Sequence, residues 1–135
     1  MLILAGVMMF SSCETIIDPK LADAEPVMVI DAWLDNKSEN QMVILTKSQG
    51  YFDAAPLVAA NGATVEVLNI TSGELLIFTE QGTTGKYLWT PAAPGNTIGQ
   101  VGDQFRLSVE FDGLSYEATS AMNRVPVIDL SLIHI

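Results

Sequence analysis

Hydrophobic and polar residues alternate along much of this chain, as they do in β-strands that bury one face. In 104–111 (QFRLSVEF) every second residue is hydrophobic, and in 63–70 (ATVEVLNI) the odd-numbered residues are expected to share the buried face. Five further segments have the composition of strands: 27–34, 41–47, 75–80, 86–90 and 114–121. Turn-forming residues separate these segments, and Asp112-Gly113 is among the strongest short hairpin signals. The pattern therefore predicts seven strands.

Seven short strands separated by turns at regular intervals are typical of an all-β sandwich. The segment 48–61 is interpreted as a loop. Residues 27–129 are interpreted as one domain, because about a hundred residues are enough for a single hydrophobic core. Outside the first dozen residues, no segment of useful length has a helical period. We therefore expect a seven-stranded β-sandwich over 27–129.

The first residues have the pattern of a bacterial lipoprotein signal peptide. A short apolar run over 2–10 is followed by Ser11-Ser12-Cys13. The run is too short for a transmembrane helix, which needs about 20 residues, and a buried strand fits the polar residues after Cys13 less well. We expect residues 1–12 to be removed, Cys13 to be lipidated and the acidic segment 13–26 to act as a tether. Because no Lys or Arg precedes the apolar run, the start at Met1 is interpreted as truncated or wrongly chosen.

The last six residues, 130–135 (LSLIHI), resemble the in-frame translation of the end sequence of a transposase-type sequencing adapter. The alternative interpretation is a further strand after Pro126. The distinction matters for function, because His134 is the only histidine in the chain. If the tail is an adapter artefact, the protein has no histidine here and its natural C-terminal sequence is missing.

The net charge indicates which classes of partner the domain is not suited to bind directly. The net charge is −10, and all 16 acidic and all 6 basic residues lie between Cys13 and Asp129. Such an acidic surface disfavours nucleic acid and direct contact with anionic headgroups. It suits a domain that is held off a membrane by lipid, where stable anchoring takes more than one acyl chain. With a single cysteine, no disulfide can form within the chain.

Candidate catalytic chemistry is sparse. Nucleophilic catalysis needs Ser or Cys beside a His base, but Cys13 is expected to be acylated and His134 to be spurious. The sequence has no cluster of His and Cys for zinc, and acidic groupings such as Asp31 with Asp35 are expected by chance among 16 acidic residues. The oxygen-rich segment 35–40 (DNKSEN) suits calcium in composition but lacks EF-hand spacing, so a solvated turn is favoured. We expect no catalytic residue, no metal site and no cofactor.

The aromatic residues are the better candidates for binding. Tyr51 and Phe52 lie in the expected loop, beside alanine and proline, and are predicted to be an exposed pair that could contact a ligand or partner. Trp33 and Trp89 lie in expected strands. These two tryptophans are predicted to be core residues rather than a binding platform.

A set of short motifs in a fixed order carries a family resemblance. The motifs are CE at 13–14, AEP at 24–26, YFD at 51–53, NGATV at 61–65, GKY at 85–87, VGDQFRL at 101–107 and GLSYEAT at 113–119. In this order they resemble the N-terminal portion of the Bacteroidota outer-membrane lipoproteins of the domain of unknown function 4249 family. The strands are also similar, more loosely, to transthyretin-like and carboxypeptidase-regulatory-like seven-stranded modules, which implies an immunoglobulin-like or prealbumin-like sandwich.

The resemblance also implies a place and a role. It implies a lipid-anchored protein of the cell envelope, on the periplasmic or outer side of the outer membrane, accessory to nutrient uptake through a TonB-dependent receptor. We expect a non-enzymatic lipoprotein of this kind. The alternative is a structural β-sandwich that spaces a missing C-terminal ligand-binding domain from the membrane.

Overall fold

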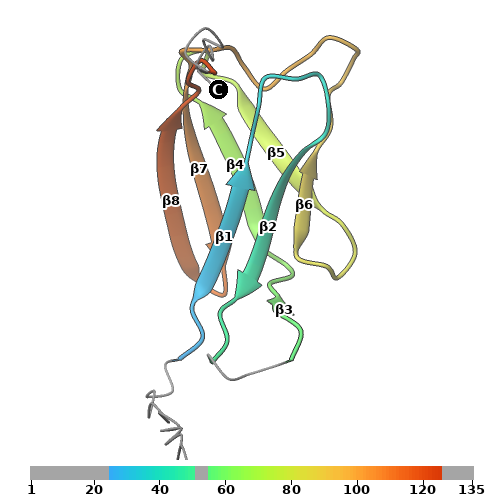
Figure 1. Cartoon of the computed structure of the whole chain (residues 1–135), viewed down its shortest axis with the longest axis vertical. Coiled ribbons are helices and arrows are strands. Elements are labelled where there is room, and N and C mark those ends of the chain that lie inside the picture. The colour runs from blue at the N-terminus through green and yellow to red at the C-terminus, as the bar shows by residue number, and fades with distance from the viewer. Residues whose placement is uncertain (1–24, 51–54, 126–135) are drawn as a thin grey trace, which may run out of the picture.

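The computed structural model describes residues 25–50 and 55–125, and within these ranges every regular element is a β-strand. The eight strands are β1 (Met28–Trp33), β2 (Gln41–Lys47), β3 (Val58–Ala59), β4 (Thr64–Asn69), β5 (Leu75–Glu80), β6 (Lys86–Trp89), β7 (Gln104–Phe111) and β8 (Leu114–Ala121), as Figure 1 shows. The all-β prediction and all seven predicted strands are confirmed. The two-residue strand β3 was missed, because it lies in the segment interpreted as a loop. No helix capable of crossing a membrane occurs in the described ranges.

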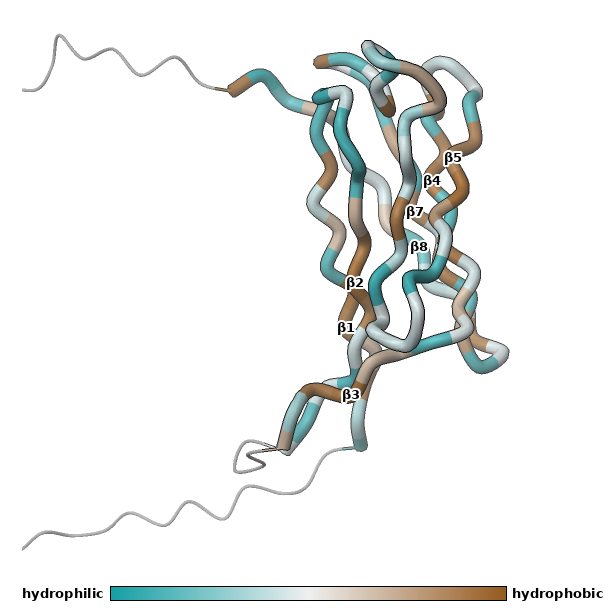
Figure 2. Tube along the Cα trace, turned by 90° about the vertical axis from the view of Figure 1, so that its right-hand side faces the viewer, coloured by the Kyte–Doolittle hydropathy of each residue, from teal (hydrophilic) through white to brown (hydrophobic). Residues whose placement is uncertain are grey.

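The strands form one antiparallel sheet that curls into a half-barrel. The order of hydrogen-bonded neighbours is β1-β2-β6-β5-β4-β7-β8, and β3 pairs with β2. β5 is the corner of the curl, because Leu75–Phe78 pair with β4 whereas Thr79 and Glu80 pair with β6. Seen from the side, β1 and β2 form one wall and β4, β5, β7 and β8 form the other (Figure 2). The two walls enclose the hydrophobic core.

The core is built from the alternate positions that the sequence pattern marks as inward. The buried hydrophobic residues are Val43, Leu45, Ala60, Val65, Val67, Leu76, Phe78, Tyr87, Ile98, Phe105 and Val109. They come from every strand between β2 and β7 along the sheet, as well as from two loops. By contrast, β1 and β8 contribute no fully buried side chain to this core. The core is therefore complete in the middle of the sheet and thin at its two ends.

The hairpin turns follow the residue types that their backbone angles require. Asp112 and Gly113 join β7 to β8 with φ of 51° and 77°. Two successive residues with positive φ are the requirement of a type I′ hairpin turn, and Asp-Gly supplies them at low cost. The predicted hairpin at this position is confirmed, and β8 is consequently held against β7 along its whole length.

Tyr87 connects the two walls through its hydroxyl group. The side chain is completely buried, and the hydroxyl donates to the carbonyl oxygen of Ala60 at 2.9 Å and accepts from the N–H of Ala63 at 3.0 Å. Burial raises the pKa of this phenol, and the nearby carboxylate of Glu80 raises it further. The residue thus fixes the segment that leads from β3 into β4.

Candidate functional site

The two ends of the sheet face each other across an open side of the half-barrel. β1 and β8 are the terminal strands, and no strand of the described ranges pairs with the outer edge of either. Every neighbouring pair along the sheet is antiparallel, and six pairings separate β1 from β8, so these two strands run in the same direction (Figure 1). An unpaired strand edge presents a row of free N–H and C=O groups that can pair with another strand.

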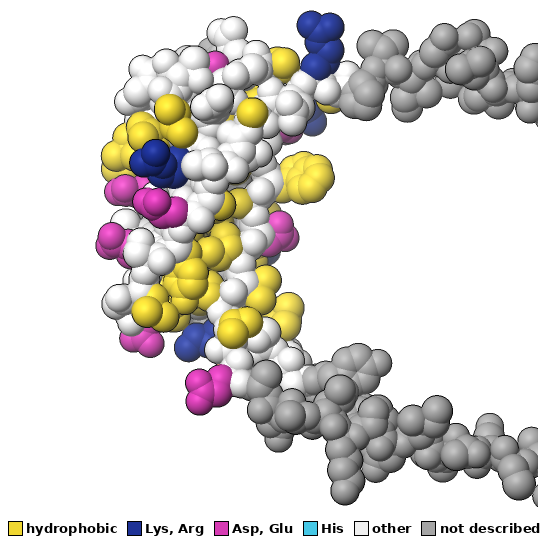
Figure 3. All heavy atoms as spheres, turned by 90° about the vertical axis from the view of Figure 1, so that its left-hand side faces the viewer, with side chains coloured by type: hydrophobic (Ala, Val, Ile, Leu, Met, Phe, Trp, Pro, Cys, Tyr) yellow, Lys and Arg dark blue, Asp and Glu magenta, His cyan; other side chains and the backbone are white. Residues whose placement is uncertain are grey.

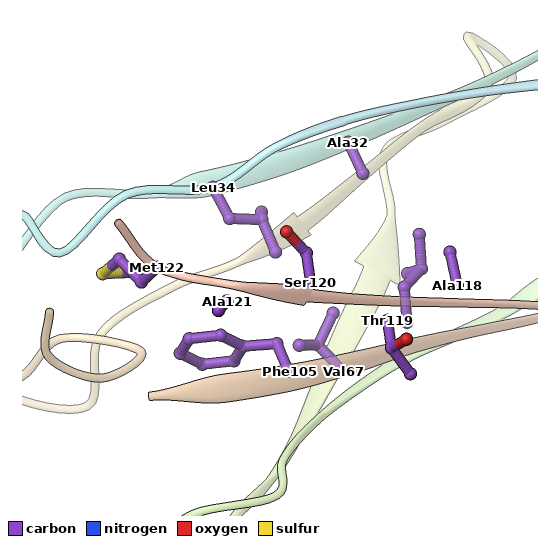
Figure 4. Close-up of a pocket in the computed structure, with 10 residues that line it drawn as sticks. Ala32, Leu34, Val67, Phe105, Ala118, Thr119, Ser120, Ala121 and Met122 are labelled. Atoms are coloured by element: carbon purple, nitrogen blue, oxygen red, sulfur yellow. The ribbon is translucent and has the colours of Figure 1, made fainter. Parts of the chain in front are cut away.

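An apolar groove lies between these two edges and leads into the core. Its volume is about 200 Å³. Val67 of β4 and Phe105 of β7 lie at its floor, while Leu34, just after β1, and Ser120 of β8 point toward one another across it (Figure 4). The remaining lining residues are Ala32, Leu107, Ala118, Thr119, Ala121 and Met122.

Small side chains on β8 are the reason that the groove is open. The register with β7 places Ala118 beside Leu107 and Ser120 beside Phe105, on the inward face. Alanine and serine are too small to reach β1, so both remain exposed although they face the core side. Figure 3 shows the result, a band of hydrophobic side chains visible along this side of the molecule. A cavity of 150 Å³ is enough to hold benzene, so this groove has room for one or more apolar side chains of a partner.

Trp33 lies on the outer face of β1, beside the groove. Its side chain is 87 % exposed, and its cross-strand neighbour Met42 is also exposed. The prediction that Trp33 is a core residue is therefore wrong, because the residues of β1 that face the core are Met28, Ile30 and Ala32. The same prediction is confirmed for Trp89, which is half-buried against the core.

A shallow hollow of about 250 Å³ borders Trp33, and acidic residues line it: Asp31, Asp35 and Glu39. The carboxylate of Asp35 is held by contacts with neighbouring residues of its own turn. Its Oδ1 accepts from the N–H of Lys37 at 3.0 Å and from the side-chain amide of Gln41 at 3.1 Å, and its Oδ2 lies 3.6 Å from Lys37 Nζ. The hydrogen bond from the Lys37 N–H, followed by that from Gln41 and the charge of Lys37, holds the pKa of Asp35 below its usual value. These contacts are those of a side-chain-stabilised turn.

The acidic residues at the two free edges have no such partners. Asp31 on β1 and Glu117 on β8 both point outward and are exposed. Within the described part of the chain, the pair of Lys37 with Asp35 is the one ion pair, so neither edge carboxylate is neutralised by a neighbouring cation. The free edges therefore carry negative charge on their outer faces and apolar surface on their inner faces.

A polar network lies at the end of the core near the groove. Asn69 is almost fully buried, and its amide donates to the carbonyl oxygen of Ile98 and to Asp103 Oδ2. Asp103 also accepts from the N–H of Gln100 at 2.9 Å. These two hydrogen bonds, the one from Gln100 being the larger cause, lower the pKa of Asp103. The network is fully satisfied and orders the loop that precedes β7.

Other residues singled out from the sequence lie outside the described residues. They are Cys13, Tyr51, Phe52 and His134, so the predictions of lipidation at Cys13 and of an exposed pair at Tyr51 and Phe52 stay predictions. Within the described ranges, no group of three or more His, Cys, Asp or Glu side chains is placed to hold a metal ion. The residues brought together at the groove were not identified from the sequence. The available signal was the inward face of 114–121, which carries alanine and serine where a closed core would need larger residues.

A family model described as "Domain of unknown function (DUF4249)" matches residues 14–133, which is most of the chain. No curated protein and no solved structure matches.

Proposed function

The chain belongs to the DUF4249 family, and from that premise we propose that it is a non-enzymatic lipoprotein that docks a segment of a partner protein at the open side of its sheet. The partner that we propose is a TonB-dependent receptor of the outer membrane, for which the domain serves as an accessory in nutrient uptake. The observation that carries this proposal is the groove between β1 and β8, because it combines an apolar cavity with two free strand edges.

Strand addition is the binding mode that such a surface supports. A partner segment in extended conformation hydrogen-bonds to a free edge, and its alternate side chains enter the cavity. The backbone bonds supply affinity and the cavity supplies specificity. Both components are available here, since the cavity is lined mainly by apolar side chains such as Leu34, Phe105 and Leu107.

We also propose a more specific description of the fold and of the N-terminus. The half-barrel is an immunoglobulin-like or transthyretin-like sandwich that is open on one side, in keeping with its two facing walls. Residues 1–12 are a lipoprotein signal peptide, and Cys13 carries the lipid that anchors the domain to the outer membrane. The acidic segment 13–26 is then the tether between this lipid and the domain.

The anchoring part is tested in a native host by Cys13→Ser. We expect the wild-type protein in the membrane fraction, labelled by a radioactive fatty acid, and the variant in the soluble fraction without label. An unlabelled wild-type protein, or a variant that stays in the membrane fraction, would contradict lipid anchoring.

The docking part is tested by copurification from solubilised outer membranes. Ala118→Lys places a charge in the groove, whereas Ile77→Lys places the same charge on the exposed outer face of β5, away from both free edges. We expect a TonB-dependent receptor to copurify with the wild-type protein and with Ile77→Lys, but not with Ala118→Lys. Equal recovery of the receptor with both variants would show that the groove is not the docking site, and recovery with none of the three proteins would contradict the receptor as partner.

A further inference from the structure

We infer that the segment docked in the groove is a single β-strand of the partner protein, antiparallel to both β1 and β8, with apolar side chains facing inward and arginine or lysine side chains facing outward. This inference rests on the proposed docking function and adds the direction and the chemistry of the partner. It follows from the strand directions, from the lining of the groove and from the charges on the outer faces of its two edges.

The direction follows from the number of strands. β1 and β8 run in the same direction because an even number of antiparallel pairings separates them. A single strand placed between them therefore has the same relation to both, and the antiparallel relation continues the alternation of the whole sheet. Antiparallel pairs are the more stable type per residue. One such strand would close the half-barrel with eight strands along the path and remove both free edges.

The inward side chains follow from the lining. In a strand, successive side chains point to opposite faces, so every second residue of the partner enters the groove. There it meets Ala118 and Ser120 on one side and Ala32 and Leu34 on the other. Because the side chains on β8 are small, the partner must supply the missing apolar volume. Valine, leucine or isoleucine at alternate positions is the composition that fits.

The outward side chains follow from the charges. Ala32 of β1 and Ala118 of β8 lie at the same end of the groove (Figure 4). Asp31 directly precedes Ala32, and Glu117 directly precedes Ala118. Because β1 and β8 run in the same direction, the two carboxylates also share one end of the groove, one on each edge. Both point to the outer face. An outward residue of the inserted strand lies between them, where a carboxylate of the partner would be repelled and a cation would be attracted by both.

Trp33 strengthens the preference for a cation. It shares the outer face of β1 with Asp31 and stands almost fully exposed. An indole ring attracts a guanidinium or ammonium group through its electron-rich face. The nearest basic residue to β8 on the outer face, Arg106, lies on β7 opposite Thr119, one strand further from the groove. The outer rim of the groove is thus complementary to a basic strand.

Three synthetic peptides test the inference on the whole chain carrying Cys13→Ser. Each has about eight residues in which valine alternates with arginine, glutamate or serine. Exposed ion pairs and an exposed cation–π contact each strengthen binding only modestly, but the arginine peptide can form several of them at once. We therefore expect the arginine peptide to bind about tenfold more tightly than the serine peptide, with the glutamate peptide weakest, as measured by fluorescence anisotropy at physiological salt.

Charge-matched variants separate the site from the general acidity of the protein. Asp31→Asn with Glu117→Gln should abolish the preference for arginine over serine. Glu66→Gln with Glu110→Gln removes the same charge from the outward faces of β4 and β7 and should leave the preference intact. Trp33→Ala should weaken the arginine peptide about threefold, whereas Ile77→Ala, an exposed residue on the outer face of β5, should not.

The outcomes show whether the docking proposal, the basic character of the partner, or both are wrong. If no peptide binds, the groove is not a strand-docking site and both proposals are overturned. If the serine and arginine peptides bind equally, docking stands and the basic character of the partner is overturned. The double variant of Glu66 and Glu110 could remove the preference for arginine as completely as the double variant of Asp31 and Glu117. In that case the preference is caused by the overall charge of the protein, and the inference of a specific site is wrong.

Discussion

Tyr87→Phe isolates one pair of buried hydrogen bonds without changing the packing of the core. The tyrosine ring is completely buried, and phenylalanine fills the same volume. The substitution removes the hydroxyl that donates to the carbonyl oxygen of Ala60 and accepts from the N–H of Ala63. Ala60 is itself buried, so its carbonyl oxygen loses its partner where water has little access, whereas Ala63 is only half-buried.

The magnitude follows from these two losses. A buried polar group left without a partner costs about 1–3 kcal/mol, whereas a group that water can reach costs much less. We therefore expect the free energy of unfolding to fall by about 2 kcal/mol. For a domain of this size, that fall corresponds to a decrease of roughly 10 °C in Tm.

The assay is urea or thermal unfolding followed by tryptophan fluorescence, with Tyr116→Phe as the matched control. Tyr116 is half-buried on β8, and its hydroxyl makes no hydrogen bond within the described residues. The control should change the free energy of unfolding by less than about 0.5 kcal/mol. If the two variants had equal stability, the hydroxyl of Tyr87 would not hold the segment before β4, and the reasoning would be refuted.

The pH dependence of Tyr87 has a definite sign. Its folded-state pKa is raised above the ordinary value of 10.0, chiefly by burial. The stability that depends on the neutral phenol is therefore fully present below that value and is lost as pH rises through the folded-state pKa. The difference in stability between the wild-type protein and Tyr87→Phe should consequently shrink above pH 10, and a difference that stays constant up to denaturation would contradict the assignment.

Three further predictions concern single residues. Gly85→Ala should lower the free energy of unfolding in urea by at least about 1 kcal/mol more than Gly82→Ala does. Both residues have positive φ, but only a Cβ at Gly85 would collide with the carbonyl oxygen of Leu45. Equal losses of stability would contradict this prediction. Asp103→Asn should reduce the loss of stability that acid causes, measured by thermal unfolding between pH 6 and 2. The lowered pKa of Asp103 gives stability that is present above the unfolded-state pKa and is lost as pH falls through the folded-state pKa. The same loss of stability in the variant and in the wild-type protein would argue against this role. Trp33→Ala should change the free energy of unfolding by less than about 0.5 kcal/mol, since the side chain is largely exposed, and a larger loss would show that Trp33 supports the fold.

The strands were predictable because their signals are local. Alternation placed Phe105 and Val109 on the buried face, and Asp112-Gly113 gave the hairpin without any knowledge of distant residues. The strand β3 was not predictable in this way. It has two residues, and it forms only because β2 offers an edge with which Val58 and Ala59 can pair. The curl of the sheet likewise depends on β5 changing partners from β4 to β6, which leaves no mark in the sequence of β5.

Trp33 shows why residue type alone misplaces a side chain. A tryptophan within a hydrophobic strand is usually buried, and the segment 27–34 is hydrophobic on both faces. Which face is buried depends on register, because a shift of one residue exchanges the two faces. The pairing of Ile30 with Leu45 and of Ala32 with Val43 places the even-numbered residues of β1 inward. Trp33 therefore points outward, and only the pairing with β2 shows it.

The groove illustrates how a site can arise from residues that carry no chemical signature. Alanine and serine at 118 and 120 are unremarkable in the sequence, and the alternation in 114–121 predicts a strand whatever their size. Their effect appears only because the neighbouring inward residues, Leu107 and Phe105, are large and the facing strand β1 is a free edge. A closed sandwich would place apolar bulk at those two positions. The described residues leave that volume unfilled and also leave both adjacent edges unpaired. One added strand would both cover the apolar surface and pair the free backbone groups. The unfilled apolar volume and the unpaired edges lie at the same place. This coincidence is the strongest structural reason to regard the open side as a binding site rather than as a poorly packed end of the sheet.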